Sequence, residues 1–124
     1  MVNPASEKIL SDVKVIVLRV ILNYLPQKNV FIFLFGSQVS KEEFSASDID
    51  VGLLCDDKVD NSILVKIKDE IAEKVRTLRH IDLIDFNTVN DKLFLESALR
   101  RIIIWHETPK SKIYLDNLKK RLGV

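Results

Sequence analysis

Two aspartates separated by a single residue, Asp48 and Asp50, are the side chains of this sequence best suited to chemistry. In a β-strand alternate side chains share a face, so these carboxylates would lie about 6.6 Å apart, at roughly 3.3 Å of rise per residue. Carboxylate oxygens are ligands that magnesium prefers. Asp50 also stands among apolar residues, where an unpaired carboxylate is costly. The pair therefore predicts a bound divalent cation.

A glycine and a serine, Gly36-Ser37, follow the apolar run 31–35 and precede Asp48 by a short insert. Glycine lets backbone N–H groups approach a phosphate closely, and the serine amide and hydroxyl can bind a terminal phosphate. Alone, Gly-Ser is more often a strand-to-helix turn with a capping serine, and Asp48 alone could be a cap or turn acid. The combination of a strand, Gly-Ser, a short insert and a strand with Asp-x-Asp is a specific signal for phosphate and metal binding.

This order of motifs resembles the signature of the DNA polymerase β-type nucleotidyltransferases, and the small size resembles the minimal nucleotidyltransferase (MNT) group. The resemblance covers about residues 30 to 86. It implies that Asp48 and Asp50 hold magnesium and the nucleoside triphosphate, and that a third acid arrives on a later strand. The candidate is Asp82, and its competitor is Asp85 on the opposite face of the same strand.

The nucleotide-binding residues that the resemblance implies are Gly36, Ser37 and a basic side chain just after them. Many relatives carry an arginine and a small residue at that point, whereas this chain has Gln38-Val39-Ser40-Lys41. Lys41 is the candidate substitute for the arginine. In nucleotidyl transfer two metal ions serve the attacking and leaving oxygens, so we expect two Mg²⁺ ions with ATP as substrate. Asp48, Asp50 and Asp82 are the expected catalytic residues and metal ligands.

The acceptor of the nucleotide is expected on another protein, because only about forty residues follow the three acid-bearing segments. The resemblance implies which one. Minimal nucleotidyltransferases are commonly encoded beside a small helical HEPN protein, which is an RNase toxin, while the MNT protein is its antitoxin. The implied reaction is transfer of AMP to a partner tyrosine. The alternatives are an antitoxin that neutralises its partner by binding alone, and transfer to a small molecule in a pocket that a homodimer could build.

The composition predicts one globular domain over residues 1–124, with 47% hydrophobic residues and a net charge of +1. Interspersed charges give no reason to expect nucleic acid as a direct ligand or a membrane surface as a partner. Cys55 is the single cysteine, no signal-peptide pattern opens the chain, and Lys14 and Arg19 interrupt its first apolar helix. We therefore expect a cytoplasmic protein.

Apolar periodicity and turn residues predict strands that alternate with helices, which is an α/β (α+β) fold of the polymerase β type. Its sheet should be small and mixed, with three to four strands flanked by helices. Thr88 and Asp91 have the spacing of a capping box, and Gly123 is suited to end the last helix. The predicted helices span about 5–25, 37–44, 62–78, 88–100 and 108–123, and the strands 30–35, 48–54, 81–86 and 102–105.

Four further residues have weaker signals. His80 and His106 lack metal-like spacing with Cys55, so packing or solvent exposure is the better expectation for each. Cys55 is expected to be a small hydrophobic residue at a strand end. Trp105 is at least as suited to core packing as to an interface.

Overall fold

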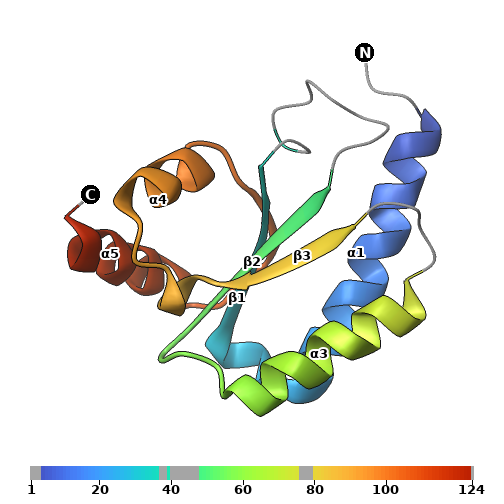
Figure 1. Cartoon of the computed structure of the whole chain (residues 1–124), viewed down its shortest axis with the longest axis horizontal. Coiled ribbons are helices and arrows are strands. Elements are labelled where there is room, and N and C mark those ends of the chain that lie inside the picture. The colour runs from blue at the N-terminus through green and yellow to red at the C-terminus, as the bar shows by residue number, and fades with distance from the viewer. Residues whose placement is uncertain (1–3, 37–38, 40–47, 76–79, 124) are drawn as a thin grey trace.

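The computed structural model describes residues 4–36, 39, 48–75 and 80–123, and it places a four-stranded sheet between two pairs of helices (Figure 1). The predicted helix at 37–44 lies outside the described residues, apart from Val39. The α-helices are α1 (Pro4–Tyr24), α3 (Asn61–Lys74), α4 (Lys92–Leu99) and α5 (Ser111–Leu122); the 3-10 helices are η1 (Gln27–Asn29) and η2 (Phe86–Thr88); the strands are β1 (Val30–Phe35), β2 (Ile49–Cys55), β3 (Ile81–Asp85) and β4 (Ile103–His106).

The sheet is mixed, as the sequence predicts, with the strand order β3-β2-β1-β4. β1 pairs antiparallel with both β2 and β4, whereas β2 and β3 run parallel. A parallel pair needs a crossover connection, and α3 supplies it. The registers set Phe35 opposite Asp50, and Asp50 opposite Asp82. Three neighbouring strands therefore bring the signature residues to the same end of the sheet.

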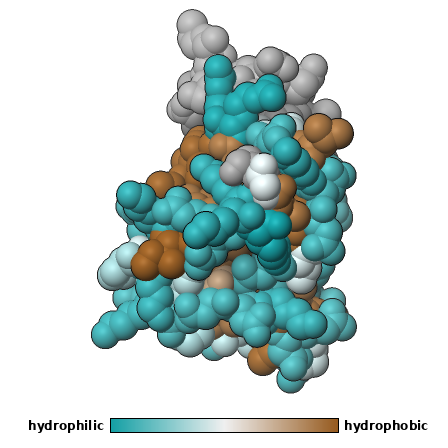
Figure 2. Space-filling model, turned by 90° about the vertical axis from the view of Figure 1, so that its left-hand side faces the viewer, coloured by the Kyte–Doolittle hydropathy of each residue, from teal (hydrophilic) through white to brown (hydrophobic). Residues whose placement is uncertain are grey.

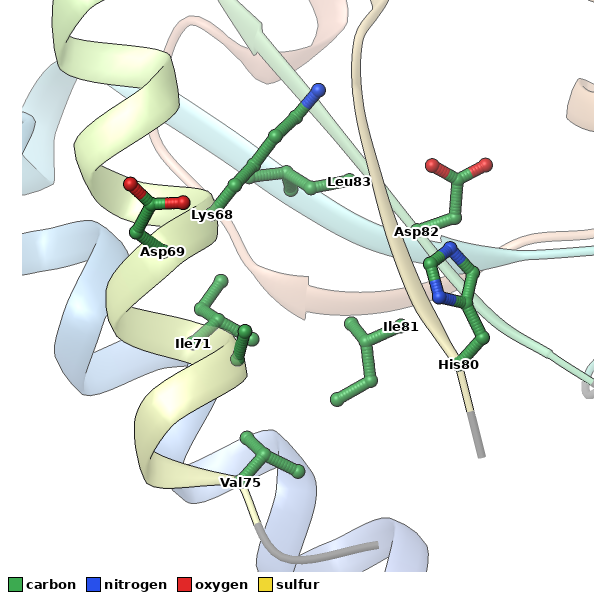
Figure 3. Close-up of a pocket in the computed structure, with 9 residues that line it drawn as sticks. Lys68, Asp69, Ile71, Val75, His80, Ile81, Asp82 and Leu83 are labelled. Carbon is green, nitrogen blue, oxygen red and sulfur yellow. The ribbon is translucent and has the colours of Figure 1, made fainter. Parts of the chain in front are cut away.

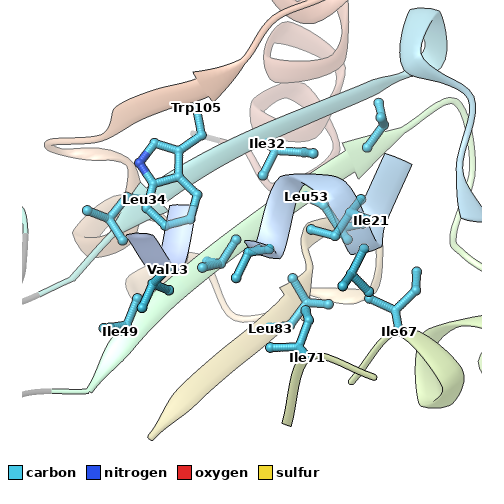
Figure 4. Close-up of a cluster of buried hydrophobic side chains, with 14 residues drawn as sticks. Val13, Ile21, Ile32, Leu34, Ile49, Leu53, Ile67, Ile71, Leu83 and Trp105 are labelled. Carbon is cyan, nitrogen blue, oxygen red and sulfur yellow. The ribbon is translucent and has the colours of Figure 1, made fainter. Parts of the chain in front are cut away.

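The two faces of the sheet have separate cores. On one face α1 and α3 pack over aliphatic residues of β1, β2 and β3 and over Trp105 of β4, which confirms the core alternative for that residue (Figures 1 and 4). On the other face α4 and α5 cover an aromatic cluster. The first core contains Val13, Val17, Val20, Ile21, Val30, Ile32, Leu34, Ile49, Val51, Leu53, Ile67, Ile71, Leu83 and Trp105, and the second contains Phe31, Phe33, Phe35, Leu54, Phe86, Leu95, Ala98, Tyr114 and Leu118.

Two predicted helix boundaries are wrong. α3 ends at Lys74 and does not continue to residue 78, because Val75 adopts an extended backbone (φ −86°, ψ 121°) while its side chain still packs on the aliphatic core. Residues 76–79 lie outside the described part. Thr88 does not cap α4, because it belongs to η2 and donates its hydroxyl to the Asp85 carbonyl at 2.8 Å. The cap is Asp91, which accepts from the Phe94 N–H at 3.1 Å.

The remaining boundaries agree with the predictions to within about three residues. Gly123 ends α5 in the left-handed conformation, with φ of 71°. α1 begins and ends one residue before its predicted limits, and β4 is shifted by one residue and is an edge strand. Among the described helices, none is both long and apolar enough to cross a lipid bilayer.

Candidate active site

Asp50 and Asp82 lie side by side on adjacent parallel strands, in register with each other. Neighbouring strands of a sheet are about 4.8 Å apart, so the two carboxylates emerge close together. Both side chains are half-buried, whereas Asp48, one residue before β2, is exposed. Because side chains alternate along a strand, Asp50 shares its face with Leu54, which belongs to the aromatic core. The acids therefore open away from α1 and α3.

The pKa of the Asp50 carboxylate is raised above its ordinary value. Burial is the largest cause, followed by the negative charges of Asp82 and then Asp48, while His80 acts in the opposite direction. Three carboxylates that repel one another are stabilised when a cation joins them. The charge arrangement thus favours a cation at this position.

Gly36 closes the site on the β1 side, at the end of the strand that pairs with Asp50. Its φ of +79° lies in the region that side-chain-bearing residues rarely adopt. A Cβ atom at this position would collide with Oδ2 of Asp50 and would lie 3.2 Å from its Cγ. Glycine is therefore needed here for the Asp50 carboxylate itself, in addition to any nucleotide. Ser37 and Lys41, the other predicted nucleotide-binding residues, lie outside the described residues.

Aromatic rings form a floor beneath the acids. The ring of Phe35 meets that of Phe86 edge-on, with centroids 5.1 Å apart. A Cβ at Gly52, two residues after Asp50, would lie 2.5 Å from the Phe33 ring and 2.7 Å from that of Phe86. The backbone of β2 therefore rests directly on these rings. This contact fixes the strand that carries Asp50.

Asp85, the competitor for the role of third acid, has a structural role. Its side chain is 2% exposed and accepts hydrogen bonds from the Val59 N–H at 2.7 Å and the Asn87 N–H at 3.0 Å. Burial raises the pKa of this carboxyl, and the two backbone hydrogen bonds partly oppose that shift. Asp85 thus joins the loop after β2 to the start of η2. Asp82 is left as the carboxylate of β3 that faces Asp50.

His80 is a neighbour of the acids, although its sequence context predicted only packing or solvent exposure for it. It lies two residues before Asp82, and Figure 3 shows the two side chains on the same side of the strand. The spacing of two residues before a candidate acid is the signal that could have identified it. A half-open pocket of about 480 Å³ adjoins this point between α3 and β3 (Figure 3). Its lining includes Lys68, His80 and Asp82.

Comparison with known proteins agrees with this geometry. The family model for polymerase beta nucleotidyltransferases matches residues 19–110, which include all three acids and Gly36. The chain belongs to this nucleotidyltransferase family. No curated protein has a significant sequence match to the chain.

Several solved structures with a similar fold are toxin-antitoxin complexes. One is a toxin-antitoxin with AMP-PNP, with a TM-score of 0.69, 18% identity, and coverage of 89% of this chain and 86% of that one. A second is a tri-AMPylated HEPN toxin from Shewanella oneidensis with its MNT antitoxin, with a TM-score of 0.66, 17% identity, and 91% and 86% coverage. A third, the MntA-HepT pair, has a TM-score of 0.65, 17% identity and the same coverage as the second. At these identities the likeness establishes the fold.

The donor atoms of the three acids suit a divalent cation such as magnesium. All three candidate side chains are carboxylates, the hard oxygen ligands that magnesium prefers. In the described ranges no group of three or more His, Cys, Asp or Glu side chains is arranged to hold a metal ion by itself. Magnesium usually completes its shell with water and substrate phosphates, so an open set of acids fits it.

Proposed function

We propose that this protein is a magnesium-dependent nucleotidyltransferase of the MNT type that transfers AMP from ATP to a hydroxyl of a partner protein. The observation that carries the proposal is the parallel register of Asp50 and Asp82. These acids lie next to Gly36, where a Cβ atom would collide with the Asp50 carboxylate. Asp48, Asp50 and Asp82 are the proposed metal ligands and catalytic residues. Gly36, Ser37 and Lys41 are the proposed nucleotide-binding residues.

Asp48, Asp50 and Asp82 would hold the metal ions, which would supply positive charge for the phosphoryl oxygens on both the attacking and the leaving side. The acceptor hydroxyl oxygen attacks the α-phosphorus of ATP and forms a new oxygen-phosphorus bond. The bond from that phosphorus to the oxygen bridging to the β-phosphorus breaks, and pyrophosphate leaves. Asp82 accepts the hydroxyl proton. Gly36 leaves room for the Asp50 carboxylate, and the aromatic floor supports the strand that carries it, so the position of Asp50 is set before the nucleotide arrives.

The proposed partner is a helical HEPN protein whose toxicity the modification suppresses in the cytoplasm. Support comes from the structural neighbours, which are toxin-antitoxin complexes, one of them with an AMPylated HEPN toxin and one with AMP-PNP. The acceptor hydroxyl would be that of a tyrosine, as the family resemblance implies. The second candidate is an antitoxin that acts by binding alone, and it is kept because an arginine is missing after Gly36-Ser37.

A transfer assay tests the proposal. The chain is co-purified with the HEPN protein encoded beside its gene and incubated with magnesium and ATP labelled at the α-phosphate. We expect label on the partner, none when the label is at the γ-phosphate, and a loss of at least about 100-fold in the Asp82→Asn variant. Absence of label from the wild type, with the toxin still suppressed, would favour the binding antitoxin.

The matched control in this assay is Asp85→Asn. Asp85 lies on the same strand, but its carboxylate binds backbone N–H groups, and an asparagine oxygen can accept one of these bonds. Transfer by this variant should therefore stay within a few-fold of the wild type. Equal losses in the two variants would contradict the assignment of Asp82.

A further inference from the structure

β3 is an edge strand, and no strand in the described part of the chain pairs with its outer side. Within the described chain it is bonded to β2 alone. The N–H of Ile49 donates to the carbonyl of His80 at 2.9 Å, and Ile49 is in register with Ile81. Backbone groups alternate in direction along a strand, so His80 and Asp82 direct theirs toward β2. The N–H and C=O groups of Ile81 and Leu83 therefore point outward.

This arrangement has a direct consequence for any strand added antiparallel to that edge. Residues opposite Ile81 and Leu83 would exchange hydrogen bonds with them, and the residue between would face Asp82 in a non-hydrogen-bonded pair. In such pairs the Cα atoms are about 4.5 Å apart and the side chains lie closest. The side chain opposite Asp82 would emerge on the face that also carries Asp50.

The neighbours of that residue would point to the other face of the sheet, where the structure has a matching pocket. The pocket of about 480 Å³ lies between α3 and β3 (Figure 3). Its apolar lining comes from Ile71, Ala72, Val75, Ile81 and Leu83. Its polar lining comes from Lys68, Asp69, His80 and Asp82, which carry charges of both signs. Apolar side chains therefore suit the part of the pocket between α3 and β3.

We propose that the partner presents its acceptor as an extended segment that adds to the outer edge of β3. The acceptor tyrosine pairs with Asp82, and its two apolar neighbours enter the α3–β3 pocket. Main-chain hydrogen bonds supply affinity and alternate side chains supply specificity in this mode of recognition. The choice of tyrosine rests on the proposed function, whereas the docking edge rests on the strand register and the pocket.

The peptide acetyl-Glu-Thr-Val-Tyr-Val-Thr-Lys-amide tests the docking edge. Its binding is followed by NMR of the Asp50→Asn protein without ATP, so that turnover has no influence. We expect the amide signals of Ile81 and Leu83 to shift. Methylation of both valine nitrogens, which would face β3, should weaken binding at least tenfold, while methylation of the tyrosine nitrogen should leave it within twofold. Equal effects of the two modifications, or no shifts at β3, would overturn the proposal.

A pair of tryptophan substitutions on α3 tests the pocket. Ala72 and Glu73 are both exposed, but only Ala72 lines the pocket. Ala72→Trp should abolish peptide binding and labelling of the partner while magnesium-dependent ATP binding persists, and Glu73→Trp should preserve all three. A similar loss in both variants, or none in Ala72→Trp, would contradict the pocket assignment. Peptide binding without any ATP binding would instead refute the proposed function and leave the docking edge standing.

Discussion

At the scale of single residues, Gly36 is the position where the backbone and the chemistry depend on each other most closely. Gly36→Ala should lower the free energy of unfolding by about 1–2 kcal/mol, because a Cβ is strained at positive φ. It should also reduce transfer by at least about 100-fold, because the new methyl group displaces the Asp50 carboxylate. Thermal unfolding and the transfer assay measure the two effects separately.

Gly123 provides the control for Gly36. It also has a positive φ, of 71°, but a Cβ there would meet no atom within 4 Å. Gly123→Ala should therefore lower the free energy of unfolding through the same backbone strain and keep full activity. If both variants lose activity equally, the contact between Gly36 and Asp50 is not what activity requires.

Asp50 predicts a pH dependence of stability. Its pKa is raised above the ordinary 3.8, so the folded state binds this proton more tightly than the unfolded chain does. The stabilisation from the proton is complete below about pH 3.8 and is lost as the pH rises through the folded-state pKa. Metal-free Asp50→Asn should therefore be more stable than the wild type at neutral pH, and the difference should shrink in acid.

Denaturant unfolding in the presence of a chelator, from pH 4 to pH 7.5, measures this difference. Magnesium with ATP should then stabilise the wild type and leave Asp50→Asn unchanged, because only the carboxylate is a metal ligand. A wild type that is more stable than the variant at pH 7.5 without metal would contradict the repulsion among the three acids.

At the scale of elements, the buried carboxylate of Asp85 fixes how β3 leads into η2 and how β2 leads into α3. Asp85→Ala would leave the Val59 and Asn87 N–H groups without their acceptor and should cost about 2 kcal/mol. The exposed Asp57→Ala should cost less than about 0.5 kcal/mol. Chemical denaturation compares the two, and equal costs would show that Asp85 does not hold these elements together.

Element boundaries were predictable from sequence where an apolar pattern agreed with a turn residue. Pro26 and the Phe31–Phe35 run define the start of the sheet, and Gly123 defines the end of α5. The predicted boundaries were wrong where a contact between residues far apart in sequence determines the end of an element. The Asp85 carboxylate caps η2 through the Asn87 N–H and also accepts the Val59 N–H, so Thr88 belongs to η2 and does not cap α4. Val75 leaves the helix while its side chain stays against the core.

The site itself was predictable in part. Asp48 and Asp50 follow from local spacing, and Asp82 follows from its match to the third motif of the family. The contact of Gly36 with Asp50 and the place of His80 beside the acids depend on the registers of β1 with β2 and of β2 with β3. Registers between strands far apart in sequence are not encoded in local spacing, so these two features required the structure.

At the scale of the whole molecule, the two faces of the sheet have different tasks. The face under α1 and α3 is a closed aliphatic core, which supplies the apolar burial that holds the strands (Figure 4). The other face carries the aromatic floor and, at one end, the open acids. Figure 2 shows that hydrophilic residues dominate one side of the molecular surface, with only scattered hydrophobic groups. One face of the sheet thus supplies most of the apolar packing, and the other face carries the candidate active site.

Calorimetric titration of ATP into the purified protein, with and without magnesium, tests the central claim most directly. Asp48→Asn/Asp50→Asn is titrated beside the wild type, with Asp56→Asn/Asp57→Asn as a control of equal charge change at exposed positions. We predict magnesium-dependent binding that is lost in the first double variant and kept in the second. Binding that persists without magnesium or in the Asp48→Asn/Asp50→Asn variant, or no binding by the wild type, would contradict the account.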